Sequence, residues 1–259
     1  MIAVEVGAGS DVGRVRSLNE DAYHLGERIF LVADGMGGHA AGDVASRLTV
    51  DTLAERAPQP STLEELRGAI TVANTAVLEH AATHPESTGL GTTLAGLLRI
   101  GGAAEHWAAF NVGDSRVYQF LDGELRQLTV DHSEVEELIA LGQLTREEAA
   151  THPSRHIITR AIGESPMPEV DAVVFPAGRG ARFLICTDGL SGEVGDEEIA
   201  AILAAGLTAQ ETVDLLIRRA LELGGRDNVT AIVLDEPSLG PVSEADGTTN
   251  PRASMRGAS

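Results

Sequence analysis

The chain has 259 residues, enough for one large domain or two small ones, and 43% of them are hydrophobic. Its formal net charge of −20 argues against nucleic acid and anionic membrane surfaces as partners, since both attract Lys and Arg. All 19 cationic side chains are arginines, which excludes a P-loop lysine, a kinase lysine and a Schiff-base lysine. With no run of about 18 apolar residues and no secretory signal at its start, we expect a cytoplasmic protein without a membrane span.

The single cysteine, Cys186, excludes an intrachain disulfide and a cysteine zinc cluster. The position at which a cysteine phosphatase carries its phosphate-binding arginine is Gly192 here. Cys186 also lies in an apolar run, residues 183–186, which indicates a small core residue and not a nucleophile.

Two strands and two helices are expected in the first third of the chain. The strands cover residues 2–6 and 28–33, and the helices cover residues 41–56 and 62–83. The unbroken apolar run at residues 29–33 predicts a strand that is buried on both faces. It ends at Asp34-Gly35-Met36-Gly37-Gly38, which we interpret as a flexible turn.

The middle of the chain is dominated by short strands with hairpin signals. Strands are expected over residues 92–99, 105–112, 116–121 and 124–129. Asp122-Gly123 favours a tight turn between the last two. Residues 132–163 are polar, weakly helical and interrupted by His152-Pro153, so we interpret them as a lid-like excursion over the surface.

The last third returns to regular elements and then loses its apolar pattern. Strands are expected over residues 170–175, 181–187 and 229–234, and helices over residues 196–204 and 208–223. Residues 236–259 are rich in Ser, Gly, Pro and Thr, which predicts a disordered tail. Interspersed helices and hairpins predict one α+β domain over residues 1–235, with largely antiparallel sheets covered by helices.

Four aspartates share a local context, because each lies at the edge of a predicted strand beside Gly or Asn. They are Asp34, Asp114, Asp188 and Asp227, and a fifth acidic group is Glu20-Asp21. Ordinary turn chemistry explains any one of them. Together, unpaired carboxylates near the interior would repel and be poorly solvated, which a divalent cation corrects. Oxygen ligands suit Mg²⁺ or Mn²⁺, and two such ions about 3.5–4 Å apart suit phosphoryl hydrolysis.

At these residues the sequence resembles the bacterial form of the metal-dependent protein phosphatase family of type 2C (PPM). The matching segments are residues 10–21, 33–39, 91–93, 112–116, 131–133, 186–190 and 225–228. They occur in the family's order and span about residues 7–234, so the resemblance covers most of the chain.

The resemblance implies a four-layer α-β-β-α sandwich, in which two central, mostly antiparallel sheets are flanked by helices. It also implies two to three divalent cations, Mn²⁺ or Mg²⁺, in a cleft at one end. Asp34 would bridge two of them, and Gly35 would offer its carbonyl. The remaining ligands implied are Asp188, Asp227, Glu20, Asp21 and, with Asp188 at a third ion, Asp114.

The same resemblance assigns phosphate binding to Arg16, whose planar guanidinium suits two phosphate oxygens. His39 either protonates the leaving oxygen or caps the following helix. The implied reaction is hydrolysis of phosphoserine and phosphothreonine on proteins by a water bridging two cations, which counteracts Ser/Thr kinases. Phosphorylated proteins, including such kinases, are the expected partners of a monomeric enzyme.

Two alternatives stay open at this point. The first is a phosphatase fold that has lost catalysis and signals by docking. The second is a phosphatase that acts on a small phosphorylated metabolite. All the expected acidic positions are present, which disfavours the first alternative.

Overall fold

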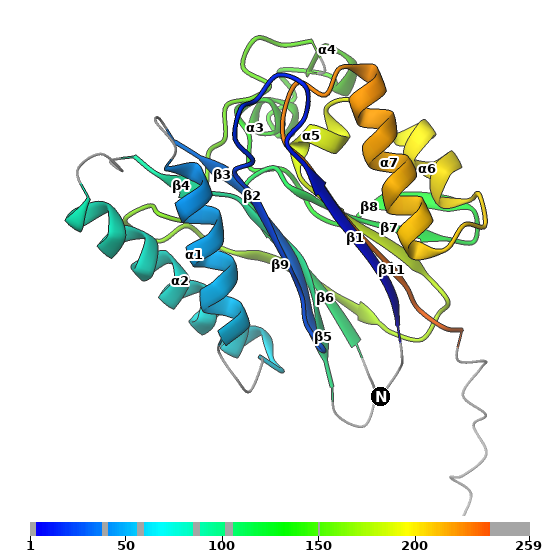
Figure 1. The fold of residues 1–259 in the computed structure, drawn as a ribbon, viewed down its shortest axis with the longest axis horizontal. Coiled ribbons are helices and arrows are strands. Elements are labelled where there is room, and N and C mark those ends of the chain that lie inside the picture. Colours follow the sequence, from blue (N-terminus) through cyan, green and yellow to red (C-terminus); the bar gives the residue numbers. More distant parts are fainter. Residues whose placement is uncertain are drawn as a thin grey trace, which may run out of the picture.

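The computed structural model describes residues 4–37, 41–55, 60–84, 89–101, 106–149 and 151–238. Two antiparallel sheets pack face to face, and helices cover the outer face of each (Figure 1). The predicted α-β-β-α sandwich is confirmed. Among the described residues, no helix combines the length and the apolar character needed to cross a bilayer.

In the described part of the chain, the first sheet has five strands in the order β1-β11-β10-β7-β8. They are β1 (Glu5–Asp11), β7 (Arg116–Leu121), β8 (Glu124–Gln127), β10 (Arg182–Cys186) and β11 (Val229–Asp235). β1 pairs with β11 along its whole length, from Glu5 opposite Asp235 to Asp11 opposite Val229. The first and the last strand therefore lie side by side in one sheet.

The second sheet has six strands within the described residues, in the order β2-β3-β5-β6-β9, with β4 paired to β3. They are β2 (Asp21–Leu25), β3 (Ile29–Met36), β4 (Gly91–Thr92), β5 (Leu94–Ile100), β6 (His106–Val112) and β9 (Asp171–Pro176). Each neighbouring pair is antiparallel, in agreement with the hairpin signals of the sequence.

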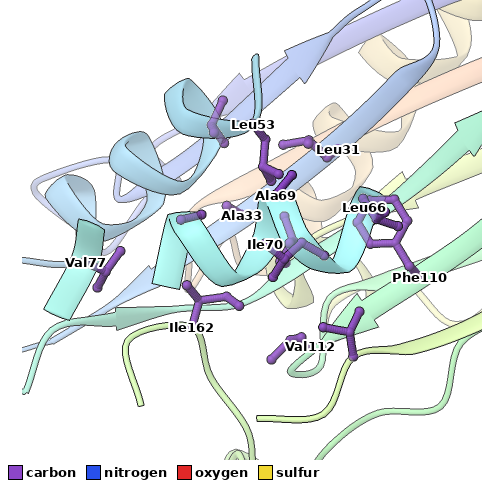
Figure 2. Packing of buried hydrophobic residues seen from close by; sticks show 14 of the residues in the cluster. Leu31, Ala33, Leu53, Leu66, Ala69, Ile70, Val77, Phe110, Val112 and Ile162 are labelled. Atoms are coloured by element: carbon purple, nitrogen blue, oxygen red, sulfur yellow. The ribbon is translucent and has the colours of Figure 1, made fainter. Parts of the chain in front are cut away.

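Alternating side chains of β3 enter two separate parts of the core. Ile29 and Leu31 pack against the helices on the outer face, with the cluster shown in Figure 2. Phe30 and Val32 point the other way and pack between the two sheets with Trp107. Because neighbouring residues of a strand face opposite sides, an unbroken apolar run is what a doubly covered strand requires. The predicted burial on both faces is confirmed.

Helices lie on both outer faces and at one end of the sandwich (Figure 1). α1 (Gly42–Glu55) and α2 (Leu63–Thr83) cover the second sheet, and α6 (Asp196–Leu203) and α7 (Ala209–Leu223) cover the first. α3 (Glu134–Ala140) and α4 (Arg146–Ala149) belong to the predicted lid, residues 132–163. α7 begins with a capping box, in which Thr208 and Glu211 satisfy each other's backbone N–H groups.

Three local features differ from the sequence prediction. β1 (Glu5–Asp11) continues past the predicted end at residue 6 because it pairs with β11 over that length, and residues 2 and 3 of the predicted strand lie outside the described residues. β3 runs through Asp34 to Met36, where a turn was expected, because Asp21 and Thr92 pair with it. A short helix, α5 (Asp188–Ser191), follows β10 and was not predicted. Pairing across the sheet, which local sequence does not reveal, decides these boundaries.

The ordered chain extends past the predicted domain boundary at residue 235. Glu236 is buried, and its carboxyl oxygens accept N–H groups from the Trp107 indole (2.7 Å), Gly178 (2.6 Å) and Arg179 (3.0 Å). Arg99 lies over the same indole, 5.0 Å from the ring centroid. Glu236 therefore fastens the end of β11 to β6 of the other sheet. The rest of the predicted tail, residues 239–259, lies outside the described residues.

Replacing Glu236 with Ala is expected to lower the free energy of unfolding by roughly 3 kcal/mol, because the buried N–H groups of Trp107 and Gly178 and the partly buried N–H of Arg179 lose their acceptor. Glu236→Gln keeps one acceptor oxygen, so its free energy of unfolding should fall clearly less than that of Glu236→Ala. Urea denaturation of both variants measures the difference. A Glu236→Ala variant within about 0.5 kcal/mol of the wild type would contradict this role.

Candidate active site

The acidic residues singled out in the sequence gather at one end of the sandwich. Asp21 and Asp34 are cross-strand partners in β2 and β3. Asp114 follows β6, Asp188 begins α5 after β10, and Asp227 precedes β11. Because the two sheets face each other, these strand ends border a single cleft of about 940 Å³.

Most of the predicted site residues line this cleft. Those that do are Arg16, Glu20, Asp34, Gly35, Asp114, Asp188 and Asp227. Asp21 is buried, with 8% of its surface exposed, beside its cross-strand partner Asp34. His39 lies outside the described residues. The structure thus brings together the residues that the sequence separates, while their individual roles stay predictions.

Several of these carboxylates are buried without full hydrogen bonding. One oxygen of Asp21 accepts the hydroxyls of Thr187 (2.9 Å) and Thr230 (2.6 Å). The other oxygen of Asp21, and one oxygen each of Asp114 and Asp188, find no hydrogen-bond partner among the described residues. Buried oxygens without partners are rare, and around a cleft they suit the ligands of a divalent cation.

Burial also raises the pKa of these carboxyl groups. The pKa of Asp21 rises to about 7 and that of Asp114 to about 8, first through loss of solvation and then through the charge of Asp188. Loss of solvation also raises the pKa values of Asp34 and Asp188. Repulsion from Asp21 raises the pKa of Asp34 further, and repulsion from Asp227 does the same for Asp188. A positive ion would relieve both effects.

The residues fit a hard divalent cation that keeps part of its water shell. Among the described side chains, no group of three or more His, Cys, Asp or Glu forms a ready chelating set. A carbonyl such as that of Gly35 and water molecules would therefore complete the coordination, as is common for Mg²⁺ and similar ions. Gly35 has to be glycine, because a side chain there would overlap the backbone of Gly42 and Glu20.

Arg16 reaches the cleft from the connection between β1 and β2. Its guanidinium donates to Asp227 at 2.7 Å, and half of its side-chain surface is exposed. This hydrogen bond, followed by the charge of Asp227, raises the pKa of Arg16. Asp227 therefore orients a permanently charged, planar donor at the mouth of the cleft, where an anion arrives.

Thr92 and Thr93 fix the backbone of Asp34. The Thr92 hydroxyl donates to the Asp34 carbonyl (2.8 Å), and the Asp34 N–H donates to the Thr93 hydroxyl (3.0 Å). The Thr93 hydroxyl also bonds Ser115, the residue after Asp114, at 2.7 Å. Residues 91–93 belong to a segment that matches the family, but their sequence predicts no role for them, because a threonine hydroxyl carries no local sign of its partner.

Asn228 shapes the segment that carries Arg16 and Glu20. Its amide donates to the carbonyls of Val12 and Leu18, both at 2.9 Å, and its oxygen accepts the Glu20 N–H at 2.8 Å. Sequence reasoning missed this role as well. The only available signal was the position of Asn228 directly after Asp227.

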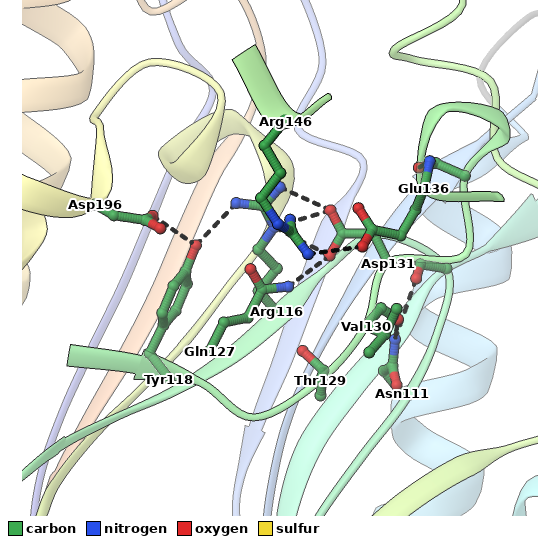
Figure 3. Close-up of polar contacts among 12 residues, drawn as sticks. Asn111, Arg116, Tyr118, Gln127, Thr129, Val130, Asp131, Glu136, Arg146 and Asp196 are labelled. Atoms are coloured by element: carbon green, nitrogen blue, oxygen red, sulfur yellow. Dashed lines mark hydrogen bonds and ion pairs between the residues drawn. The ribbon is translucent and has the colours of Figure 1, made fainter. Parts of the chain in front are cut away.

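Arg116 joins the first sheet to the start of the lid (Figure 3). It donates to both carboxylate oxygens of Asp131 at 2.7–3.0 Å, and to the Tyr118 hydroxyl at 2.9 Å. Tyr118 in turn donates to Asp196 at 3.2 Å. On the lid itself, Arg146 of α4 pairs with Glu136 of α3 at 2.9 Å. These bidentate contacts hold the lid base against one wall of the cleft.

The lid forms the opposite wall. Its side chains that line the cleft include Val135, Ile139, Arg155, His156 and Ile158. The far end of the lid is held by antiparallel pairing of Ile162 with Thr92, the residue that also binds Asp34. The lid predicted from the sequence therefore borders the acidic site.

The comparisons with known proteins agree with this geometry. Residues 8–222 match the model of the family described as protein phosphatase 2C. The chain belongs to the protein phosphatase 2C family. It is 40% identical over 238 residues to the serine/threonine protein phosphatase PstP of Mycobacterium tuberculosis, covering 90% of this chain but only 45% of that protein. It is 38% identical to the serine/threonine phosphatase stp of Listeria monocytogenes, covering 87% of this chain and 93% of that protein.

Solved structures of this family share the fold. The crystal structure of M. tuberculosis PstP superimposes with a TM-score of 0.84 at 40% identity, over 90% of this chain and 99% of that one. The catalytic domain of PstP in complex with two manganese ions gives a TM-score of 0.83 at 37% identity, over 92% and 100% of the two chains.

The raised pKa values predict that the metal-free protein loses stability as pH rises. Between the ordinary value of 3.8 and the folded values of about 7 (Asp21) and about 8 (Asp114), the folded state binds more protons than the unfolded state. The contribution of these two carboxyl groups to stability is fully present below pH 3.8, and it is lost as the pH rises through their pKa values in the folded state. The midpoint of thermal unfolding in chelator should therefore fall between about pH 5 and about pH 8.

Asp114→Asn should flatten this pH dependence, while Asp122→Asn, at an exposed hairpin turn, should leave it unchanged. Differential scanning calorimetry of the three proteins in chelator makes the comparison. Equal slopes for Asp114→Asn and the wild type would argue against a buried, repelled carboxylate.

Proposed function

We propose that this chain is a protein serine/threonine phosphatase that uses Mn²⁺ or Mg²⁺ to hydrolyse phosphoserine and phosphothreonine on other proteins. The observation that carries this proposal is the set of buried carboxylate oxygens without partners around one open cleft, beside Arg16. The chain spans about 45% of the length of PstP, so the activity is proposed here for the domain that it contains.

Asp34, Asp188, Asp227 and the Gly35 carbonyl would hold two cations, with Glu20 and Asp21 acting directly or through water. Asp114 and Asp188 would hold a third. When bound, such ions neutralise charge on phosphate oxygens and lower the pKa of water. The similar structure of PstP with two manganese ions supports this assignment.

The chain's own side chains would bind and orient the phosphorylated residue. Arg16 offers its guanidinium to phosphate oxygens, and Asp227 sets its direction. His39, in the segment outside the described residues, stays a candidate proton donor for the leaving oxygen. The lid residues opposite the carboxylates would decide which protein segments enter the cleft.

A cysteine nucleophile is disfavoured by the position of Cys186. Its side chain is fully buried in the first sheet, and burial raises the pKa of its thiol to about 12. A thiol that is neutral and inaccessible cannot attack phosphorus. Direct attack by water therefore suits this site better than a phosphocysteine intermediate.

Phosphorylated proteins, Ser/Thr kinases among them, are the proposed substrates of a cytoplasmic, monomeric enzyme. A docking module without catalysis is disfavoured, because buried repelling carboxylates would burden a domain that had no ion to bind. Assays on phosphoserine, phosphothreonine and phosphotyrosine peptides and on small phosphate metabolites, with Mn²⁺ or with chelator, separate these functions. Turnover confined to metabolites would overturn the protein-phosphatase proposal.

Asp34→Asn and Asp188→Asn are expected to reduce Mn²⁺-dependent turnover of a phosphothreonine peptide by more than about 100-fold, since each removes a proposed metal ligand. Glu198→Gln, in a surface pair with Arg219, is the matched control and should keep wild-type turnover. Initial rates over a Mn²⁺ titration provide the measurement. Substantial activity in both aspartate variants would count against the metal site.

Arg16→Ala is expected to lower kcat/KM for the same peptide by about 100-fold, through loss of charge-assisted hydrogen bonds to the phosphate. Arg16→Lys keeps the charge but not the planar fork, and should recover only part of the activity. Inhibition by inorganic phosphate, measured in parallel, should weaken in Arg16→Ala. An unchanged inhibition constant would place the phosphate elsewhere.

A further inference from the structure

His132, the first residue of the lid, makes hydrogen bonds to both the N–H and the carbonyl of Gly113. The His132 N–H donates to the Gly113 carbonyl at 2.9 Å, and the Gly113 N–H donates to His132 Nδ1 at 3.1 Å. His132 has 5% of its surface exposed, so water does not compete for these bonds. Both polar groups of the Gly113 backbone are therefore held by one residue.

The contacts of the ring define its tautomer. Because Nδ1 accepts from Gly113, the proton of the neutral ring lies on Nε2, which donates to Asp171 at 3.1 Å. Arg160 Nη1 lies 3.3 Å from the same Nε2 and, as a donor only, makes no hydrogen bond to it in this tautomer. Asp171 also accepts from Arg160 at 3.2 Å. Burial lowers the pKa of His132 and the nearby Arg160 acts in the same direction, which outweighs the opposing Asp171 and keeps the imidazole neutral.

Gly113 is a position where the backbone direction decides the neighbouring side chain. Its φ is +99°, and a side chain there would overlap Thr93. The next residue is Asp114, whose buried oxygen lacks a partner in the described structure. Asn111 also donates to the Gly113 carbonyl at 3.2 Å and, as Figure 3 shows, to Val130 at 2.8 Å. The turn that aims Asp114 is thus fixed from the lid side.

The other side of His132 belongs to the lid. Its carbonyl accepts the N–H of Thr159, and the next residue, Ser133, pairs with Ile158. His132 therefore stands between the returning segment of the lid and the turn that carries Asp114.

We propose that His132 is a positioning residue, whose Nδ1 fixes the Gly113–Asp114 turn and so couples the lid base to the Asp114 carboxylate. The proposal rests on the proposed function insofar as Asp114 is taken to bind a divalent cation. It assigns His132 no contact with substrate or with the reacting atoms.

Two variants each keep only one of the two contacts made by the nitrogen atoms of the His132 ring. His132→Asn keeps an oxygen near the place of Nδ1, so it can still accept the Gly113 N–H. His132→Gln places its amide near Nε2, so it can still reach Asp171 but leaves the Gly113 N–H without an acceptor. Val213→Ala, on the buried face of α7, is a control for lost stability alone.

The first measurement needs no metal. Amide hydrogen exchange of Gly113, followed by NMR in chelator, should be faster by about tenfold or more in His132→Gln than in His132→Asn. Long-range ¹⁵N–¹H correlations of the wild type should show the proton on Nε2. A proton on Nδ1, or equal Gly113 exchange in the two variants, would overturn the proposal whether or not the protein binds metal.

The second measurement is Mn²⁺ binding by titration calorimetry, alongside turnover of a phosphothreonine peptide. His132→Gln should weaken binding at the site that contains Asp114 by about 10- to 100-fold, and His132→Asn should stay within about threefold of the wild type. Val213→Ala should leave binding unchanged at a comparable loss of thermal stability. Equal weakening in both His132 variants, or none in His132→Gln, would refute the positioning role, whereas a wild type that binds no Mn²⁺ would instead refute the proposed function.

Discussion

The burial of several like-charged carboxylates at one end of the sandwich is the constraint on which the rest of the site depends. Loss of solvation raises the pKa of Asp21, Asp34, Asp114 and Asp188, and the charge of Asp188 or Asp227 raises each of them further. A globular core would normally exclude such a group of residues. Such carboxylates cost stability in the metal-free form, and the cations proposed to bind there would offset that cost.

Neutral hydrogen-bonding residues hold that arrangement in place. Thr92 and Thr93 fix the Asp34 backbone, Asn228 fixes the segment of Glu20, and His132 fixes the turn before Asp114. None of these side chains adds charge to an already crowded site. Neutral supports suit such a site because they hold the backbone without adding charge, whereas Arg16, which pairs with Asp227 at the mouth of the cleft, is the proposed phosphate-binding group.

Both sheets contribute carboxylates to the cleft. Asp34 and Asp114 come from the second sheet, whereas Asp188 and Asp227 come from the first. At the far end, Glu236 joins the sheets through Trp107. The relative position of the carboxylates therefore depends on the packing between the sheets, and the family membership of the chain reflects this whole architecture rather than a single loop.

The sequence by itself determined the alternation of buried strands, the main helices, the family and the acidic residues of the cleft. Those features are encoded locally. The spacing of apolar residues indicates the strands and helices, and short motifs with Asp beside Gly or Asn indicate the acidic residues and the family. Only the tertiary structure decided that β3 continues through Asp34, that Glu236 is buried, and that Asn228 and His132 hold backbone segments. Hydrogen bonds between residues far apart in the chain depend on sheet register and packing, and a Thr, Asn or His carries no local mark of the partner it will meet.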